Sequence, residues 1–510
     1  MKHALPVTRE ADFAAWYQSV VTEADLAEES GVRGCMVIRP WGYGIWERIQ
    51  RLLDDRIKAT GHENCYFPLF IPLSYFAKEA EHVEGFAKEM AVVTHHRLIA
   101  DGKGGLVPDP SAKLEEPLVV RPTSETVIGA AFARWIQSWR DLPVLVNQWA
   151  NVVRWEMRTR MFLRTSEFLW QEGHTAHATA AEAREETRAM LEVYRAFSED
   201  VVAMPVVAGE KPENERFPGA VETWSIEAMM QDGKALQAGT SHFLGTKFAS
   251  AQGIRFQNAA GELELANTTS WGMSTRMIGG LIMTHGDDDG LRVPPRLAPW
   301  QVVIVPMLRD SAEDEAIVAY CKALQAELAT RSAFGEPVRA LLDLKPAKAT
   351  AKRWGWVKKG APVVIEVGAR DVAGGNVSVI RRDRLYREGG KVDGRILPLA
   401  GFADDVPDLL VDIQSSLHAE ARDRLEAGIA RDVTDMAGLE AHFADGIRRP
   451  GWVEVQWSRP TGAALDAVVE RLKALKLTIR NTPVDAAPAD GACLFTGEPA
   501  VERILVARAY

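Results

Sequence analysis

The chain has 510 residues, of which 47% are hydrophobic and 25% charged, and its formal net charge at pH 7 is −10. This length predicts three or four domains with ample core, and the composition is that of an ordinary soluble globular protein. No apolar stretch is long enough to span a membrane, no apolar signal stretch follows Met1, and the four cysteines are scattered singly, which argues against a disulfide framework. We therefore expect a cytoplasmic protein without a membrane partner.

A helix is predicted from about Gly44 to Thr60. Its apolar residues recur at helical spacing, and Gly61 is a common signal for the end of a helix. These apolar residues are Ile45, Ile49, Leu52, Leu53 and Ile57.

A polar corner follows the apolar pair Val119 and Val120. Arg121 to Glu125 (R-P-T-S-E) precedes a stretch with apolar residues at helical spacing, so its hydroxyls and carboxylate are expected where a strand meets a helix. Such a corner offers polar groups to a ligand. Serine and threonine are also favoured as ordinary N-caps, and for Ser124 alone the N-cap is the simpler interpretation.

The stretch from Arg154 to His177 (R-W-E-M-R-T-R-M-F-L-R-T-S-E-F-L-W-Q-E-G-H-T-A-H) predicts a strand, a basic loop and a second strand. Strand side chains alternate between two faces, so Arg154 and Glu156 should share one face of the first strand. Residues of the second strand should also project together, namely Phe168, Trp170, Glu172 and His174.

The loop between these strands carries Arg158, Arg160 and Arg164. It is too polar for a buried turn and suits a flap over an anionic ligand such as a triphosphate. The aromatic residues nearby can wall an apolar ring or stack on a base, and an acid beside them can hold an ammonium group. An exposed charged hairpin over a half-buried core face is the alternative interpretation.

Two further helices are indicated farther along the chain. Thr179 and Glu182 form a capping box ahead of one of them. The stretch from Thr269 to Arg276 (T-S-W-G-M-S-T-R) places small residues and one arginine at the start of a glycine-rich helical segment that reaches His285. The start of a helix lets backbone N–H groups and a guanidinium meet a phosphate.

The pattern changes near Pro295. The proline-rich stretch from Val293 to Pro299 breaks the preceding α+β pattern and predicts a first domain boundary. Alternating strand-like and helical segments follow at 302–305, 312–328, 338–342 and 363–367, which predicts an α/β domain. A second boundary is expected near residue 405, ahead of another helical run.

Basic residues cluster inside this α/β region. Four lysines recur at intervals of three, four and seven residues, a spacing that would line them along one side of a helix: Lys345, Lys348, Lys352 and Lys359. The net charge of −10 argues against a nucleic-acid partner, but phosphate contacts need only local lysine and arginine. A solvated helix face is the alternative.

In their order, these stretches resemble a class II aminoacyl-tRNA synthetase, specifically a prolyl-tRNA synthetase of the archaeal and eukaryotic type, over nearly the whole chain. Asn64 to Pro72 (N-C-Y-F-P-L-F-I-P) is similar to motif 1, with Pro68 at its signature position. Arg154 to His174 is similar to motif 2, and Gly272 to Arg276 to motif 3. Four stretches are typical of the prolyl family, R-P-T-S-E, E-F-L-W-Q-E-G-H, L-Q-A-G-T-S-H-F-L-G and T-S-W-G.

The resemblance implies three domains. Residues 1–295 would form the α+β catalytic domain, with an antiparallel sheet flanked by helices. Residues 296–405 would form an α/β anticodon-binding-like domain. Residues 406–510 would form a small α/β domain that resembles the family's zinc-binding domain but lacks its cysteines.

The resemblance also implies the activity of a proline–tRNA ligase. ATP would activate L-proline to prolyl-adenylate, with Mg²⁺ on the phosphates, and the prolyl group would pass to the 3′ end of tRNA(Pro). Motif 1 implies a homodimer. The segment between His177 and Gln237 is too short for the editing domain inserted in many bacterial relatives, so we expect no proofreading in cis.

Site residues are carried over from matching family positions. Arg154 and Arg276 are the expected catalytic residues, and Thr123 and Glu125 would hold the secondary ammonium of proline. The residues expected to bind ATP are Arg154, Glu156, Arg164, Phe168, Gln237, Thr240 and Arg276. Those expected to bind proline are Thr123, Glu125, Arg154, Trp170, Glu172, His174, Phe217 and Ser270. The four lysines are the expected tRNA contacts.

Two departures from the family affect metal and anticodon binding. Only Cys493 remains of the four cysteines that hold zinc in many relatives, with Thr496 and Ser458 at two ligand positions. One thiolate cannot build a tetrahedral sulfur site, so no zinc is expected. The acid and the arginine that read anticodon guanines in relatives are Val357 and Val364 here, and valine offers no hydrogen bond to a base edge.

Three interpretations therefore stay open. The first is a proline–tRNA ligase that recognises its tRNA by other contacts, such as the acceptor stem and the basic helix. The second is a paralogue that makes prolyl-adenylate for another acceptor, which Val357 and Val364 favour. The third is a non-catalytic synthetase-like binding module, although retention of Arg154, Glu156 and Arg276 argues against it.

Overall fold

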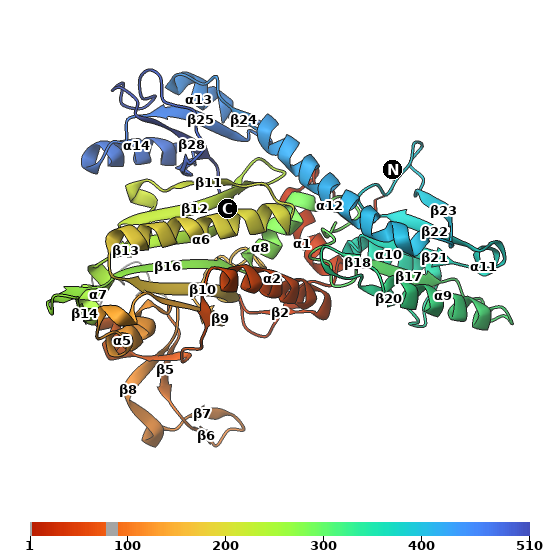
Figure 1. The fold of residues 1–510 in the computed structure, drawn as a ribbon, viewed down its shortest axis with the longest axis horizontal. Coiled ribbons are helices and arrows are strands. Elements are labelled where there is room, and N and C mark those ends of the chain that lie inside the picture. Colours follow the sequence, from red (N-terminus) through yellow and green to blue (C-terminus); the bar gives the residue numbers. More distant parts are fainter. Residues whose placement is uncertain (1–2, 78–89) are drawn as a thin grey trace.

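The computed structural model describes residues 3–77 and 90–510, and its elements form three groups, each built around its own sheet (Figure 1). No helix within these described ranges combines the length and the apolar character that crossing a bilayer requires.

The first group is built on a sheet of eight strands. Across the sheet these are β27 (Thr482–Pro483), β11 (Val207–Glu210), β12 (Glu222–Met229), β13 (Ala235–Gly245), β16 (Asn267–Ser274), β10 (Glu167–His177), β9 (Val144–Val153) and β3 (Glu63–Asn64). All neighbours run antiparallel except the edge pair β3 and β9. This sheet and its helices confirm the predicted α+β class.

Helix α6 (Ala180–Asp200) crosses this sheet, with α2 (Pro40–Ala59) beside it (Figure 1). The predicted capping box of Thr179 and Glu182 is present in both directions. α2 begins four residues before the predicted Gly44, because proline is well suited to the first position of a helix. It ends just before Gly61, whose φ of +92° no longer fits a helix.

Two other helices of this group matter for the site. α8 (Arg276–His285) follows β16 directly, and its residues from Met277 to His285 are all buried. α1 (Phe13–Glu23) packs against α8 and begins at an N-cap, Asp12, whose side chain accepts two backbone N–H groups.

An arm projects from the first group at the lower edge of Figure 1. It consists of a three-stranded sheet and a separate hairpin. The helix predicted to follow Arg121 to Glu125 comes next and is α5 (Glu125–Trp135). The other elements of the arm are β4 (Phe70–Pro72), α3 (Leu73–Ala77), β5 (Val92–His95), β6 (Leu98–Ala100), β7 (Leu106–Pro108), η1 (Pro110–Ala112) and β8 (Lys113–Val120). The smaller elements of the group are β1 (Ala27–Glu29), β2 (Met36–Ile38), η2 (Trp139–Asp141), η3 (Glu213–Glu215), α7 (Lys247–Gln252), β14 (Arg255–Gln257) and β15 (Leu263–Leu265).

The second group has a five-stranded sheet. Its strands across the sheet are β20 (Ala340–Leu342), β17 (Val302–Pro306), β21 (Val363–Val367), β22 (Asn376–Arg381) and β23 (Gly394–Pro398). β17 runs parallel to β20 and β21, which confirms the predicted alternating units, and β22 and β23 add antiparallel strands. The other elements are α9 (Asp314–Leu328), β18 (Ser332–Ala333), β19 (Glu336–Pro337), α10 (Ala349–Lys359) and α11 (Ala369–Gly374).

The long helix α12 (Phe402–Ala427) leads from the second group to the third (Figure 1). The predicted boundary at residue 405 therefore falls inside a helix, because Pro407 lies close enough to the N-terminus of α12 to be tolerated there. The third group has a four-stranded sheet of β24 (Ile429–Ala430), β25 (Trp452–Trp457), β28 (Glu502–Ala507) and β26 (Thr478–Ile479), with α13 (Met436–His442) and α14 (Gly462–Ala474). From this part of the chain β27 also joins the edge of the eight-stranded sheet.

Candidate active site

A cavity of about 250 Å³ lies against the eight-stranded sheet where β13, β16 and β10 are neighbours. Side chains of a strand alternate between its faces, and the residues of β10 that were predicted to project together all line this cavity. They are Phe168, Trp170, Glu172 and His174.

The structure brings the predicted proline and ATP residues together. All of those predicted to bind proline line the cavity, namely Thr123, Glu125, Arg154, Trp170, Glu172, His174, Phe217 and Ser270. Of those predicted to bind ATP, Arg154, Phe168, Gln237, Thr240 and Arg276 line it too. Glu156 and Arg164 line a second cavity of about 390 Å³, which shares Arg154, Phe168 and Arg276 with the first. The two cavities therefore have common walls.

Arg154 and Glu156 reach these cavities from a loop, which corrects the prediction that both lie on a strand face. β9 ends at Val153, whose partner is Glu167 at the start of β10. Arg154 N–H donates to the Ser166 carbonyl (2.8 Å) and Glu156 N–H to Ser166 Oγ (3.2 Å). β9 therefore ends three residues before Glu156, whose N–H is bound by a serine side chain and not by a partner strand.

The Arg154 guanidinium lies between residues that line the two cavities. Its Nε donates to the Pro122 carbonyl at 2.9 Å, and its guanidinium carbon lies 5.4 Å from the Trp170 ring and 5.6 Å from the Phe168 ring. Burial lowers the pKa of Arg154, and the charges of two nearby glutamates oppose that shift. The group stays a cation, since an arginine does not deprotonate in a protein.

Glu172 is the centre of a buried hydrogen-bond network in the wall of the first cavity. Its Oε1 accepts from Ser124 Oγ (2.5 Å) and Gln148 Nε2 (2.5 Å), and its Oε2 lies 3.0 Å from His174 Nε2. Burial acts to lower the pKa of His174, but the hydrogen bond and charge of Glu172, together with Glu125, outweigh it and raise the pKa. The cavity wall thus holds a histidine that is biased toward its charged form.

Ser124 corrects the simpler interpretation of the polar corner. It occupies the N-cap position of α5, but its side chain makes no capping hydrogen bond. The hydroxyl instead donates to Glu172. Next to it, Thr123 Oγ1 donates to Glu125 Oε2, and both residues are buried at the cavity.

Arg276 begins α8 and lines both cavities. Its Nε donates to the Leu163 carbonyl at 3.1 Å. Burial, with the charges of Arg164 and Arg154, lowers the pKa of Arg276 to about 10, so the side chain is charged at pH 7. It also borders a third cavity of about 370 Å³, whose walls include Arg33, Arg158, Arg160 and Tyr510.

His242 lines the first cavity as well, although the residues predicted from the sequence do not include it. Its ring centroid lies 4.8 Å from that of Phe217, and its Nδ1 lies 3.1 Å from Thr223 Oγ1. Burial, with the charge of His174, lowers the pKa of His242 to about 3, so the ring is neutral at pH 7. One signal was present in the sequence, because His242 stands two residues after Thr240 on the same strand and shares its face.

Comparison with known proteins agrees with this geometry. The family profile of the tRNA synthetase class II core domain (G, H, P, S and T) matches residues 110–285, and that of the anticodon binding domain matches residues 301–393. The chain is 78% identical to the proline–tRNA ligase of Sphingomonas elodea over 100% of both chains, and 72% identical to that of Sphingopyxis alaskensis over 100% of this chain and 96% of the other. The chain belongs to the proline–tRNA ligase family.

A solved structure is similar over nearly the whole length. The prolyl-tRNA synthetase of Cryptosporidium parvum, complexed with L-proline and AMP, is 33% identical and superposes with a TM-score of 0.86. The match covers 99% of this chain and 97% of that one.

Four lysines of the anticodon-binding part of this ligase were predicted to line one side of a helix, and that prediction is wrong. Helix α10 begins only at Ala349, so Lys345 and Lys348 precede it, and both are exposed. Lys352 is buried, and its Nζ donates to the Asp343 carbonyl at 2.8 Å. The fourth lysine, Lys359, pairs with Asp25 of the first group at 2.8 Å. The helix turns these two lysines toward protein, not toward solvent.

The two valines at the expected anticodon-reading positions are core residues. Val357 and Val364 are each 1% exposed and belong to an apolar core that extends from the first group into the second. Neither side chain reaches the surface, so neither can contact a base.

The position of the family's zinc site is occupied by hydrogen-bonded side chains. Ser458 Oγ lies 3.0 Å from Thr496 Oγ1, beside the buried Cys493. Burial raises the pKa of the Cys493 thiol, but hydrogen bonds from Ser458, Thr496 and the backbone bring it below its usual value. Within residues 3–77 and 90–510, no group of three or more His, Cys, Asp or Glu side chains could hold a metal ion.

Proposed function

We propose that the two adjoining cavities bind L-proline and ATP side by side and form prolyl-adenylate, which the chain then transfers to the 3′ end of tRNA(Pro). One observation carries this proposal: the residues predicted for the two substrates line cavities that share Arg154, Phe168 and Arg276. Membership of the proline–tRNA ligase family and the similarity to a synthetase that holds L-proline and AMP support it.

Proline would be bound by charge at one end and by aromatic rings at the other. Glu125, oriented by Thr123, would accept from the secondary ammonium group. Trp170 and Phe217 would wall the apolar ring. His174 and Ser270 would complete the pocket, with Glu172 holding the imidazole in place.

ATP would lie across the shared wall. The adenine would stack between Phe168 and Arg276, and the Glu156 carboxylate would accept from its exocyclic amine. Gln237 and Thr240 would meet the ribose, and Arg164 in the second cavity would meet the phosphates.

Arg154 would bridge the two substrates. Activation is an in-line attack of the proline carboxylate on the α-phosphate, and it needs no protein nucleophile. The protein therefore contributes by orienting the reactants and neutralising charge that develops in the transition state. A guanidinium fixed by Pro122 beside two aromatic rings can contact both the carboxylate and the α-phosphate without moving.

Mg²⁺ would be bound by the phosphates of ATP and by water, not by protein side chains. Mg²⁺ commonly keeps several waters and phosphate oxygens as ligands. The described residues offer no acidic cluster that would form a protein cage for it. No step above depends on a protein-bound metal ion.

The finer assignment to the archaeal and eukaryotic type rests on architecture. Residues 177–237, which the structure describes without a gap, contain only α6, β11, η3 and β12 between the two cavity strands. They leave no room for an inserted editing domain. We therefore infer that this ligase does not proofread in cis, although a pocket of this kind discriminates against a smaller amino acid by only about 1–3 kcal/mol per methylene.

A homodimer is proposed through motif 1. This stretch carries large apolar side chains in contact with solvent, and Tyr66 is 70% and Phe70 46% exposed. Such a patch on an isolated chain typically marks an interface. Sedimentation of the purified chain would test this, and a monomer at micromolar concentration would contradict it.

tRNA(Pro) is the proposed acceptor, and the cytoplasm is the proposed location, as for other translation enzymes. The third cavity is lined by Arg33, Arg158, Arg160, Arg164 and Arg276, and this positive charge suits a phosphodiester chain. Lys345 and Lys348 remain the proposed tRNA contacts of the second group, since both are exposed.

Two measurements test the function. Proline-dependent exchange of pyrophosphate into ATP should be present, and its absence would leave only the binding-module alternative. Charging of tRNA transcripts with altered anticodons separates a ligase that selects tRNA(Pro) from a paralogue with another acceptor. The buried Val357 and Val364 favour tolerance of anticodon changes, whereas failure to charge any tRNA(Pro) transcript would favour the paralogue.

A further inference from the structure

Helix α8 carries Arg276 at its first position, and its opposite end is held by residues from other parts of the chain. The last carbonyls of a helix have no intrahelical partners and carry a partial negative charge. Three guanidinium groups meet these carbonyls: Arg424 of α12 at the Thr284 carbonyl (2.8 Å), Arg292 at the His285 carbonyl (2.5 Å) and Arg9 at the Gly286 carbonyl (3.4 Å).

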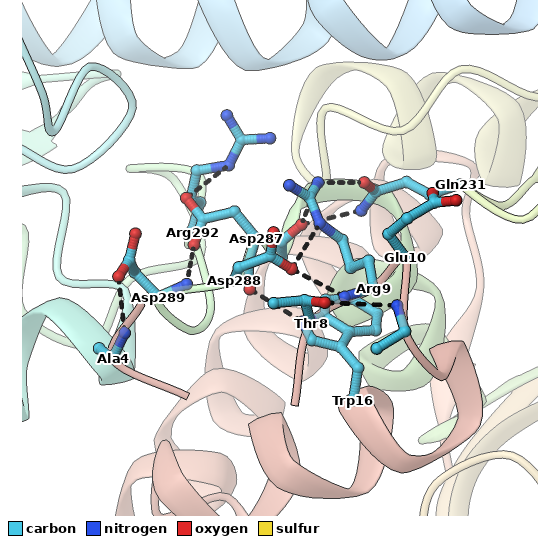
Figure 2. Close-up of polar contacts among 12 residues, drawn as sticks. Ala4, Thr8, Arg9, Glu10, Trp16, Gln231, Asp287, Asp288, Asp289 and Arg292 are labelled. Carbon is cyan, nitrogen blue, oxygen red and sulfur yellow. Dashed lines mark hydrogen bonds and ion pairs between the residues drawn. The ribbon is translucent and has the colours of Figure 1, made fainter. Parts of the chain in front are cut away.

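The loop after α8 adds three consecutive aspartates, Asp287 to Asp289, and two of them bind the N-terminal segment (Figure 2). Asp288 Oδ1 accepts from the backbone N–H of Arg9 (2.8 Å) and from its Nε (3.2 Å). Asp289 Oδ1 accepts from the backbone N–H of Ala4 at 2.8 Å. Arg9 Nη1 also donates to Gln231 Oε1 at 2.6 Å, so the segment is tied to the turn between β12 and β13 as well as to the loop.

Asp287 binds the second group. Its two carboxylate oxygens accept from Arg382 Nη1 (2.7 Å) and Nη2 (2.5 Å), a bidentate pair. Arg382 is 2% exposed, and its Nε donates to the Val357 carbonyl at the end of α10. It lies within residues 301–393, which match the anticodon binding domain. Burial raises the pKa of Asp287, but the charges of Arg382 and Arg292 bring it below its usual value, so the pair is ionic at pH 7.

Backbone contacts near this ion pair leave little room for the second group to slide along the segment that follows α8. Leu291 N–H donates to the Lys358 carbonyl (2.9 Å) and Val293 N–H to the Gly360 carbonyl (3.0 Å). A Cβ on Gly290 would lie 2.4 Å from the Lys358 carbonyl oxygen. The second group is thus docked on the residues that directly follow α8.

A buried helix transmits a displacement from one end to the other. α8 is buried from Met277 onward, and a helix keeps a fixed rise of about 1.5 Å per residue. At its N-terminus, the Arg276 Nε donates to the Leu163 carbonyl at 3.1 Å. Loosening the C-terminal end would therefore move the guanidinium that faces ATP.

We propose that Arg382 is a positioning residue for Arg276: the ion pair between Arg382 and Asp287 holds α8 in register, so that docking of the anticodon-binding part sets the ATP site. This proposal rests on the proposed function, in which Arg276 stacks on adenine. Its consequence is that a residue outside the catalytic part controls the first reaction step even when no tRNA is present.

Proline-dependent pyrophosphate exchange without tRNA tests the proposal in the full-length chain. Arg382→Met should raise the KM for ATP about fivefold or more, as expected for the loss of a coupling between sites. The KM for proline should change less than about twofold, within the range of ordinary surface effects. Arg384→Met is the matched control, because the Arg384 side chain is 55% exposed and lies no closer than 3.8 Å to a carboxylate. It should leave both KM values unchanged.

Asp287→Asn provides an independent variant that keeps shape and removes charge. It should also raise the KM for ATP selectively, and the double variant should add little to either single change. Counting active sites by the burst of ATP consumption separates this effect from misfolding, because an unfolded fraction lowers the number of sites without changing either KM.

The outcomes are distinct. Exchange in the unsubstituted chain with an unaltered ATP KM in both variants would overturn the proposal, as would equal rises in both KM values. Absence of exchange in the unsubstituted chain would overturn the proposed function, and this inference with it.

Discussion

In the cavity, Glu172 has hydrogen-bond partners on its own sheet, whereas Lys359 at the end of α10 pairs with a carboxylate from a distant part of the chain. Glu172 binds His174 two residues along β10 and Gln148 directly opposite on β9. On α10, Lys359 pairs with Asp25 of the first group.

The two cases differ because one charge pattern follows strand alternation and the other follows helical spacing. Alternation along a strand fixes which side chains share a face, and the pairing of adjacent strands then brings partners together. Helical spacing fixes only which residues share a side of a helix. It does not say whether that side meets water, nucleic acid or another domain.

Removal of the Arg154 guanidinium should give the largest effect. Arg154→Met should lower kcat/KM for pyrophosphate exchange by about 10²–10³-fold, the loss typical of one transition-state donor. Arg140→Met is the control, because that guanidinium is exposed and lies over the Trp139 ring. Comparable losses in both variants would show that the cavity is not the reaction site.

The buried His242 ring should make the free energy of unfolding depend on pH. The pKa of His242 is about 3 in the folded chain and about 6.5 when unfolded, so the unfolded chain binds a proton between these values that the folded ring does not. The neutral His242 ring contributes its full share to the free energy of unfolding above about pH 6.5. This share falls by about 1.4 kcal/mol per pH unit as the pH falls toward 3.

His242→Gln should remove this dependence on pH. Urea unfolding of both chains at pH 7, 6 and 5 measures the two slopes. Parallel slopes would mean that the His242 ring is already accessible to protons in the folded state.

Two lysines that share one sequence pattern should behave differently when each is replaced by methionine. Lys348→Met should lower tRNA affinity and reduce the slope of log affinity against log salt by about 0.9, the value for one phosphate contact. Lys352→Met should leave that slope unchanged but lower the free energy of unfolding by about 1–3 kcal/mol, because the Asp343 carbonyl loses a buried charged donor.

Filter binding at several salt concentrations and urea unfolding measure these two properties. A salt effect from Lys352 would restore the lysine stripe as a nucleic-acid surface and remove the contrast drawn above.

Metal removal should have the smallest effect. Treatment with a zinc chelator should not change the unfolding temperature, because Ser458 and Thr496 bond to each other beside Cys493. Elemental analysis of the chain purified in metal-free buffer gives the direct measurement. Stoichiometric zinc would contradict the prediction.

The cavity could be predicted from the sequence because most of its walls are local. Phe168, Trp170, Glu172 and His174 follow from a period of two on a single strand. His242 obeys the same rule on β13, where it shares a face with Thr240, but it was not among the predicted residues. Ser124 could not be predicted, since the choice between capping α5 and binding Glu172 depends on where β10 passes.

The region from 345 to 359 could be predicted only as a helix within alternating units. Its start at Ala349 and the burial of Lys352 depend on the neighbouring sheet. Likewise, the boundary expected near residue 405 lies inside α12, because nothing local prevents the helix from beginning at Phe402.

The sequence by itself determined the class of fold, the family and many of the side chains around the cavity, because strand alternation and short ordered motifs are local properties of the chain. Only the tertiary structure decided which basic residues face solvent, where Ser124 donates, and that α8 ends beside Arg9 and Arg424 from two distant segments. The contacts of Arg9 and Arg424 join residues more than a hundred positions apart, and no spacing along the chain encodes the docking of one part on another.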